Sequence, residues 1–310
     1  MQDIYQKTVS NVVSFNGIGL HSGKSSKITI TPSKENFGIV FKRVDLKVNN
    51  LVNANYESVS SAKLCTTLEN KHGVKVSTVE HLLAALYIAG IDNALIEINN
   101  EEVPIMDGSA KDFLKVLNKT NTTTLTKKRK YLKILNKVEL VDGERKISIE
   151  PNEFSFEVDF QLNYENKIIG KQRNKVNFNT DDLDDISASR TFCLFKDIEK
   201  IKKAGLAKGG SLENAVVVDE DNVINEGGLR NDREFVNHKI LDLAGDFLLS
   251  GYRILGKVIC HQGGHELSNM FLNKLMNSKL AFKNVELDNN ETVISKKENF
   301  DQSVKLVANA

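Results

Sequence analysis

The chain has 310 residues, and its 42 basic and 41 acidic side chains leave a formal net charge of +1. That balance gives no reason to expect binding to nucleic acid or to a membrane surface. The length suits two domains of roughly 150 residues each, with ample core to bury.

The three cysteines, Cys65, Cys193 and Cys260, lie far apart and form no C-x-x-C pair. Neither a disulfide framework nor a thiolate zinc site is supported, and a reducing compartment fits best. The first residues lack the apolar core of a signal peptide, and no apolar stretch approaches the ~18 residues that a bilayer span needs. We expect a cytoplasmic protein with no integral membrane segment.

The first part of the chain combines short alternating strands with two helices. The sequence I-M-D-G-S-A leads into the second helix, for which Ser109 and Asp112 have the spacing of a capping pair. The elements predicted before it are strands at 27–31 and 38–41, a helix over about 78–89 that Gly90 terminates, and a strand at 94–98.

The helix over 78–89 carries Glu80 and His81, then continues L-L-A-A-L-Y-I-A with the tyrosine hydroxyl as its only polar side-chain group. Such a helix must be buried on nearly all sides. Ser77 and Glu80 also fit an S-x-x-E capping box, in which Glu80 would be structural. Both interpretations remain open, because one carboxylate can cap a helix and still face a site.

The segment 120–130, T-N-T-T-T-L-T-K-K-R-K, contains one apolar residue and is predicted to be a linker. We place the domain boundary in it, which gives an N-terminal domain over 1–125 and a C-terminal domain over 126–310.

The second part of the chain repeats the order of strands, a histidine-bearing helix, a glycine stop and a strand. This recurrence suggests an internal duplication, although the identities are few. The order is α+β rather than alternating βαβ. The predicted elements are strands at 132–135, 146–150 and 154–160, a helix over about 232–249, Gly251 and a strand at 254–260.

A segment over about 194–224 interrupts this second part. It contains Leu194, Ile198, Ile201 and Leu206 at near-helical spacing, then two glycines and a strand at 215–218. The pattern fits either a satellite patch of core or a flap with an apolar underside.

His238 and Asp242 lie four residues apart in the predicted helix over 232–249, so both project from one face together with Asp246. With one more imidazole, the set becomes three nitrogen and oxygen ligands, as in catalytic zinc sites that keep a fourth position for water. The alternative is a solvated helix face with an incidental histidine.

His265 follows two glycines after the last of these strands, so short connections return it toward the helix of His238. It is either a hydrogen-bonded loop histidine or a proton donor whose pKa Asp246 raises.

Several motifs occur in order along the chain and together closely resemble one family. They are G-L-H-S-G, E-H-L-L-A-A-L with G-I-D-N, V-P-I-M-D-G-S-A, S-R-T-F, H-K-I-L-D-L-A-G-D and G-G-H-E-L-S-N. The chain resembles, over essentially its whole length, the zinc-dependent UDP-3-O-acyl-N-acetylglucosamine deacetylases of lipid A biosynthesis.

The resemblance implies hydrolysis of the acetamido group of UDP-3-O-(3-hydroxyacyl)-N-acetylglucosamine, which gives the free amine and acetate. It implies that His81, His238 and Asp242 hold one zinc ion, with iron as an alternative metal in the cell. Glu80 would be the general base that takes the proton of water.

By the same resemblance, His265 paired with Asp246 would stabilise the oxyanion or deliver a proton to the leaving amine. Thr191 would donate a hydroxyl hydrogen bond to the oxyanion. Lys239 would add positive charge near the substrate, or it is a solvated neighbour of His238.

The family fold implies two β-α-α-β layers packed face to face with the helices inside, each domain with a small insert. The second insert, at 194–224, would form a hydrophobic passage for the acyl chain, which favours the flap over the core patch. We expect a monomer. The candidate substrate-binding residues are Leu20, Leu64, Cys65, Phe192, Ile198, Gly210, Ser211, Ala215 and Val217.

Gln262 departs from the family pattern, because many members of the family carry a basic residue at that point. The residues that bind the diphosphate stay unassigned.

Two other classes of protein remain as alternatives. A binding protein for sugar nucleotides or acyl chains would have kept the fold without the chemistry. A different metal-dependent amidase or peptidase is disfavoured because the H-E-x-x-H signature is missing from the sequence.

Overall fold

A five-stranded sheet in the order β2-β3-β9-β4-β5 is formed by the first part of the chain in the computed structural model, which describes residues 4–288. In β3 and β9, alternate isoleucines are buried and the residues between them are more exposed, as expected for strands with one buried face. The strands are β2 (Val13–Ile18), β3 (Ser25–Pro32), β4 (Ile39–Arg43), β5 (Leu51–Asn53) and β9 (Ala94–Ile98).

A seven-stranded sheet is formed by the second part, in the order β12-β13-β18-β11-β19, with β14 paired to β18 and to β15. The central strand β18 joins parallel and antiparallel neighbours. The predicted strands of this part are confirmed. The bounds are β11 (Lys130–Ile134), β12 (Val138–Asp142), β13 (Arg145–Pro151), β14 (Phe156–Asn163), β15 (Lys171–Asn177), β18 (Arg253–His261) and β19 (Phe282–Glu286).

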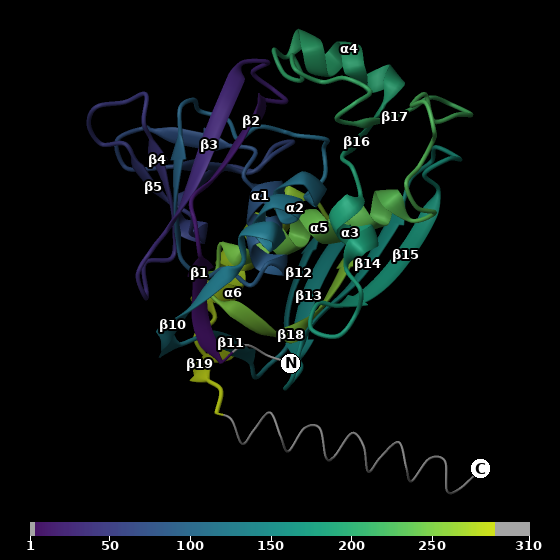
Figure 1. The fold of residues 1–310 in the computed structure, drawn as a ribbon. Helices are drawn as coiled ribbons and strands as arrows, with labels where there is room; N and C mark the ends of the chain where they lie inside the picture. The colour runs from purple at the N-terminus through teal and green to yellow at the C-terminus, as the bar shows by residue number, and fades with distance from the viewer. Residues whose placement is uncertain (1–3, 289–310) are drawn as a thin grey trace, which may run out of the picture.

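The helices pack against these two sheets and against each other (Figure 1). Helix α1 lies along α5, α2 packs on β2, α5 on β14 and β15, and α6 on β12 and β13. The fold is therefore mixed α+β, with two sheet-based bodies. The helix bounds are α1 (Glu80–Ile88), α2 (Lys111–Thr120), α3 (Asp184–Ala188), α5 (Glu234–Leu248) and α6 (His265–Asn277).

The predicted helices over 78–89 and 232–249 are confirmed as α1 and α5, which cross closely at Gly245. A Cβ atom at Gly245 would lie 2.0 Å from the backbone oxygen of Glu80. Because only glycine leaves room there, the backbones of the two histidine-bearing helices approach each other directly.

Three small sheets complete the fold. Strands β6 (Val59–Ser61), β7 (Thr67–Glu69) and β8 (Lys75–Ser77) follow a 3₁₀ turn, η1 (Tyr56–Ser58). The other two are the pairs β1–β10 and β16–β17, with bounds β1 (Tyr5–Val9), β10 (Thr122–Lys128), β16 (Phe192–Leu194) and β17 (Val216–Val218).

The predicted linker is ordered: most of segment 120–130 is strand β10, which pairs antiparallel with β1. The linker prediction is therefore wrong in conformation. No side chain of β10 is buried, so the prediction that the segment adds little to the core is confirmed. Composition identified a polar segment, but only the partner strand could order it.

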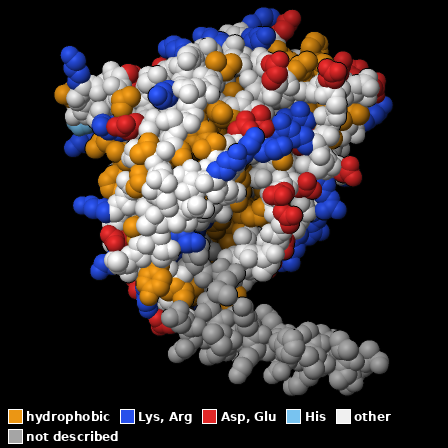
Figure 2. All heavy atoms as spheres, viewed as in Figure 1, with side chains coloured by type: hydrophobic (Ala, Val, Ile, Leu, Met, Phe, Trp, Pro, Cys, Tyr) orange, Lys and Arg blue, Asp and Glu red, His pale blue; other side chains and the backbone are white. Residues whose placement is uncertain are grey.

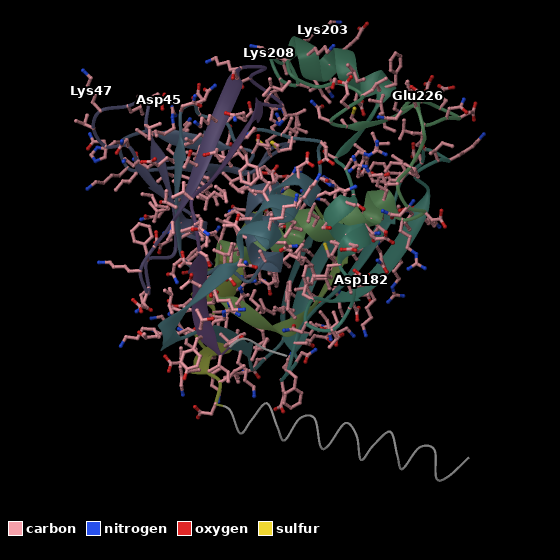
Figure 3. All side chains as sticks on the ribbon, in the orientation of Figure 1. Asp45, Lys47, Asp182, Lys203, Lys208 and Glu226 are labelled. Carbon is pink, nitrogen blue, oxygen red and sulfur yellow. The ribbon has the colours of Figure 1, made fainter. Side chains whose placement is uncertain are left out.

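The segment 194–224 contains the predicted helix as α4 (Phe195–Lys203) and the predicted strand as β17. Helix α4 buries none of its residues and lies at the outer edge of the molecule (Figure 1), whereas all three valines of β17 are buried. Figure 3 shows Lys203 and Lys208 at this outer edge. The segment thus combines an exposed helix with a buried strand.

Neither of the two capping boxes forms. Helix α1 begins at Glu80, whose carboxylate accepts a hydrogen bond from the Thr66 backbone instead, and Ser77 Oγ donates to the Glu101 oxygen. Helix α2 begins at Lys111, and Ser109 Oγ accepts from its backbone N–H at 3.1 Å without Asp112. The helices begin later than the motifs imply.

The exposed face seen in Figure 2 carries both signs of charge, in keeping with the near-zero net charge. Within residues 4–288, none of the helices has the length and apolar character that a bilayer crossing requires.

Candidate metal centre

His81 on α1 and His238 and Asp242 on α5 converge on one point. One potential ligand atom from each residue lies within 4.8 Å of those from the other two. Asp242 Oδ1 lies 3.4 Å from His81 Nε2 and 3.3 Å from His238 Nε2. All three side chains are buried, so the prediction of a solvated helix face does not hold for α5.

This arrangement fits a bound cation. Among the described residues, Asp242 Oδ1 is buried and has no hydrogen-bond partner. A buried carboxylate oxygen that faces two imidazole nitrogens is stabilised by a positive charge between them. Two nitrogens and one oxygen are the donor set of many catalytic zinc sites.

A backbone contact fixes the orientation of the His238 ring. Its Nδ1 lies 3.1 Å from the backbone oxygen of Ser189, so Nδ1–H donates and Nε2 presents its lone pair to the cluster. Burial lowers the pKa of His238 to about 3. The imidazole is therefore neutral at physiological pH, which is the form that binds metal.

Glu80 is buried beside this cluster. Its Oε2 accepts a hydrogen bond from the Thr66 backbone at 3.0 Å, and its Oε1 lies 3.6 Å from His265 Nε2. Burial raises the pKa of Glu80. A raised pKa makes the carboxylate a better proton acceptor.

His265 is the first residue of α6, so the loop prediction for it is wrong. Its Nδ1 lies 2.9 Å from Asp246 Oδ2, and its Nε2 lies 3.6 Å from Asp242 Oδ2. Burial opposes the charged form, but Asp246, Asp242 and Glu80 outweigh it and raise the pKa of His265 to about 10. The imidazolium is thus favoured at neutral pH.

Lys239 donates a hydrogen bond to Asp242 Oδ2 at 2.9 Å. Burial opposes its charge, yet the attraction of Asp242 raises the pKa of Lys239. Its ammonium lies 5.5 Å from the centre of the Phe192 ring. Lys239 is therefore a partner of the Asp242 carboxylate rather than a solvated neighbour.

Thr66 is a site residue that the sequence analysis missed. Besides the backbone bond to Glu80, its hydroxyl donates to Asp246 Oδ1 at 2.6 Å. No motif marks it; its neighbours Leu64 and Cys65 were named only through the family resemblance.

These groups open into a cavity of about 400 Å³. The predicted residues that line it are Leu20, Leu64, Glu80, His81, Thr191, Phe192, His238, Lys239, Asp242 and His265. The other lining residues were not among the predicted site residues: Ala62, Lys63, Thr78, Ile105, Arg145, Tyr164, Gly263, Gly264 and Glu266.

Other predicted residues are not among the described residues that line this cavity: Cys65, Ile198, Gly210, Ser211, Ala215, Val217 and Asp246. Asp246 lies behind His265. Segment 207–210 does not line the cavity but contacts a residue that does, because Gly209 N donates to the oxygen of Leu20 at 3.0 Å.

Gln262 is engaged within the fold, since its side-chain amide exchanges hydrogen bonds with the backbone N–H and oxygen of Asn163. The lysine and arginine side chains that line the cavity are Lys63, Arg145 and Lys239.

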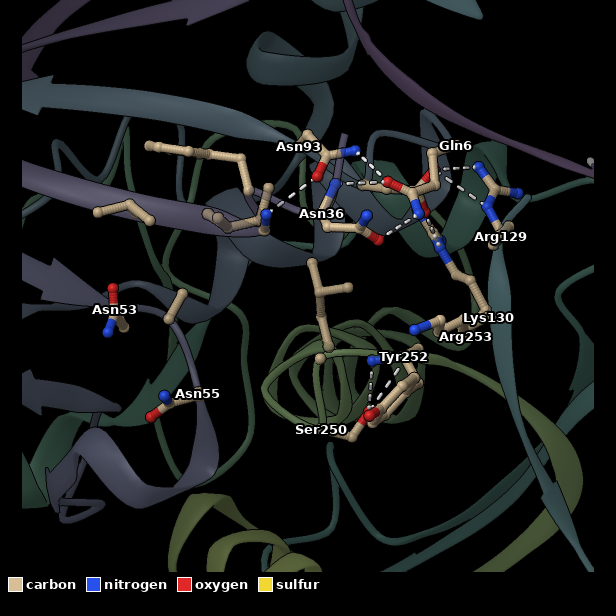
Figure 4. A pocket seen from close by; sticks show the side chains of 18 residues that line it. Gln6, Asn36, Asn53, Asn55, Asn93, Arg129, Lys130, Ser250, Tyr252 and Arg253 are labelled. Atoms are coloured by element: carbon tan, nitrogen blue, oxygen red, sulfur yellow. Dashed lines mark hydrogen bonds and ion pairs between the residues drawn. The ribbon is translucent and has the colours of Figure 1, made fainter. Parts of the chain in front are cut away.

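A second pocket, of about 430 Å³, contains many amide side chains (Figure 4). There Gln6 donates to Asn36 and accepts from Asn93, both at 3.0 Å. Arg253 donates to the Tyr87 oxygen, in the last turn of α1, and to the Ile91 oxygen, which follows the helix. These bonds join segments of the fold.

The chain is similar to known proteins over most of its length. The family model described as UDP-3-O-acyl N-acetylglycosamine deacetylase matches residues 6–277. The UDP-3-O-acyl-N-acetylglucosamine deacetylase of Geotalea uraniireducens is 41% identical over 284 residues, which cover 91% of this chain and 92% of that protein. The protein of the same name from Pseudoalteromonas translucida is 42% identical over 282 residues, 90% of this chain and 93% of its own. The chain belongs to the UDP-3-O-acyl N-acetylglycosamine deacetylase family.

Proposed function

We propose that this chain hydrolyses the N-acetyl group of UDP-3-O-(3-hydroxyacyl)-N-acetylglucosamine. The products are acetate and UDP-3-O-(3-hydroxyacyl)-glucosamine, in the committed step of lipid A biosynthesis. One observation carries the proposal: in a chain of this family, a buried His81, His238 and Asp242 cluster lies beside Glu80 and His265.

His81, His238 and Asp242 would hold a zinc ion, the metal on which the family depends, with iron as an alternative metal in the cell. When bound, zinc acidifies a water molecule and polarises the acetamide carbonyl. Three protein ligands leave a position open for water or substrate.

Glu80 would accept the proton of the attacking water at Oε1, because its Oε2 is held by the Thr66 backbone. A carbon–oxygen bond forms to the acetyl carbon, and the bond from that carbon to the sugar nitrogen breaks. His265 would deliver a proton from Nε2 to the leaving amine, since its Nδ1 is held by Asp246.

The Thr191 hydroxyl and the Lys239 ammonium would stabilise negative charge on the carbonyl oxygen. The backbone of Thr191 is fixed on both sides: its N–H donates to the Gly108 oxygen at 2.8 Å, and its oxygen accepts from Val216 at 2.7 Å. These bonds hold the main chain that carries the hydroxyl at the edge of the cavity.

The acyl chain would leave the cavity past Leu20, Leu64 and Phe192, toward the insert at 194–224. Leu20 lies 3.7 Å from a Cβ placed on Gly210, which connects the cavity wall to that insert. The further candidates along this passage are Cys65, Ile198, Gly210, Ser211, Ala215 and Val217.

We also propose two layered domains, 1–125 and 126–310, with their helices inside, in a cytoplasmic monomer. The packing of α1 along α5, and of α2, α5 and α6 on the sheets, supports this arrangement.

The test is acetate release by the purified, zinc-loaded protein from this substrate. Glu80→Gln and His265→Gln should each lower kcat by about 10²–10⁴-fold, the usual contribution of acid–base groups. Glu226→Gln, at an exposed position outside the cavity lining, is the matched control and should keep wild-type activity.

Substrate binding without acetate release would instead identify a non-catalytic binding protein. Hydrolysis of simple peptides at comparable rates would identify a general amidase.

A further inference from the structure

The segment Ser189–Thr191 presents two groups to the candidate metal centre. The backbone oxygen of Ser189 accepts from His238 Nδ1, and Thr191 lines the cavity. The segment lies between α3 and β16 and belongs to neither. Its position must therefore be set by contacts of its own.

Arg190, between these two residues, forms a buried ion pair with Glu234, the first residue of α5. Their relative exposures are 7% and 0%. Glu234 Oε1 accepts from the Arg190 backbone at 3.0 Å and from its Nε at 2.7 Å, while Oε2 accepts from a terminal guanidinium nitrogen at 3.1 Å. The pair thus fixes both the main chain and the side chain of Arg190.

Arg230 extends the contact to the first part of the chain. Its backbone N–H donates to Glu234 Oε2 at 2.7 Å, and its guanidinium donates to Asp107 Oδ2 at 2.8 Å. Asp107 precedes Gly108, whose oxygen accepts from the Thr191 backbone. Glu234 is therefore the point at which segments 107–108, 189–191 and 230–234 are held together.

Glu234 also lies on the same face of α5 as His238 and Asp242 of the candidate metal centre. Glu234, His238, Asp242 and Asp246 follow one another at intervals of four residues along α5, so they form one stripe. Along this stripe, Glu234 holds segment 189–191, His238 and Asp242 are the proposed metal ligands, and Asp246 holds His265.

We propose that Arg190 and Glu234 are a positioning pair for the deacetylase site, an inference that rests on the function proposed above. The pair holds the Ser189 carbonyl against His238, which fixes the ligand tautomer, and holds the Thr191 hydroxyl at the cavity. Neither residue lines the cavity, so both act through their neighbours.

Arg190→Lys tests this role, because lysine keeps the charge but loses the planar two-point contact with the carboxylate. We expect a 10- to 100-fold loss of zinc affinity, the usual effect of removing a partner behind a metal ligand. We also expect a lower kcat with KM within threefold of wild type, and an altered absorption spectrum of the cobalt(II)-substituted protein.

Arg173→Lys is the matched control. Arg173 makes the same two-point contact, with Asp159 at 2.8 and 2.6 Å, on strands β14 and β15 away from segment 189–191. This variant should keep the zinc affinity and cobalt spectrum of the wild type.

The inference is overturned if Arg190→Lys lowers only the unfolding temperature and keeps the zinc affinity and cobalt spectrum of the wild type. If Arg190→Lys does not fold, Glu234→Gln is read by the same three measurements. A wild-type protein that neither binds zinc nor releases acetate would refute the proposed function. Failure of the proposed function is thus distinguished from failure of the positioning role, which concerns only the variants.

Discussion

Thr66 holds two carboxylates of the site at once, through its backbone N–H to Glu80 and its hydroxyl to Asp246. Each carboxylate has one oxygen held in this way and the other directed toward His265. A small, neutral residue thus orients both carboxylates, each of which faces His265.

Thr66→Val removes the hydroxyl and keeps the shape of the side chain. Because Asp246 Oδ1 then loses a partner in a buried place, the free energy of unfolding should fall by about 1–3 kcal/mol. Urea unfolding measures this. Thr66→Ser keeps the hydroxyl and should retain most of the stability; equal losses in both variants would refute the hydrogen-bond explanation.

Cys65 and Cys260 are buried, and burial raises the pKa of each thiol to about 12. Because the thiolate is the reactive form, both should resist alkylation at pH 8 in the folded protein and react after unfolding in urea. In the unfolded chain these thiols ionise at a pH of about 8.5. Burial of the neutral thiols therefore contributes fully to the stability of the fold below that pH, and the contribution is lost as the pH rises toward 12. Mass spectrometry after alkylation checks the first expectation, and rapid labelling of either native thiol would contradict it.

At the scale of elements, the crossing of α1 and α5 sets the distances between the three proposed metal ligands. His81 lies on one helix, His238 and Asp242 lie on the other, and Gly245 allows the close approach. A change in helix spacing must therefore change the distances between His81 and the two residues on α5.

Gly245→Ala should push the helices apart, since the added Cβ would meet the backbone oxygen of Glu80. Overpacking of this kind costs about 1–3 kcal/mol, and the zinc affinity should fall with it. Calorimetry measures both. Gly143→Ala is the control: its left-handed φ of 59° makes alanine cost about 1–2 kcal/mol, but nothing lies within 4 Å of the new Cβ. An unchanged zinc affinity in Gly245→Ala would refute the spacing argument.

At the scale of the whole molecule, the candidate metal site joins α1 of the first part to α5 of the second. A ligand that binds only the folded state stabilises it by mass action. The zinc site should therefore contribute to the stability of the whole fold.

Removal of zinc by a chelator should lower the unfolding temperature, and added zinc should restore it. At a free zinc concentration 1,000 times Kd, the stabilisation is about 4.1 kcal/mol. His81→Ala lacks one ligand, so its unfolding temperature should respond far less to zinc. A response equal to that of the wild type would place the zinc elsewhere.

Local periodicity predicted both histidine-bearing helices and the helix of the insert, because alternation and helical spacing are properties of neighbouring residues. It also predicted eight of the nineteen strands of the described residues: β3, β4, β9, β11, β13, β14, β17 and β18. The spacing of His238, Asp242 and Asp246 put them on one face for the same reason. Segment 120–130 was predicted to be a linker because the strand that most of it forms, β10, is ordered by pairing with β1, which is distant in the sequence.

The sequence by itself determined the α+β class, the ligand-bearing helices and, through its ordered motifs, the family. Only the tertiary structure decided that the polar face of α5 is buried, that Glu80 contacts Thr66 rather than capping its helix, and that Arg190 pairs with Glu234. The physical reason is that a side chain's spacing fixes its direction from the backbone, whereas its burial, partners and pKa depend on what other segments pack against it.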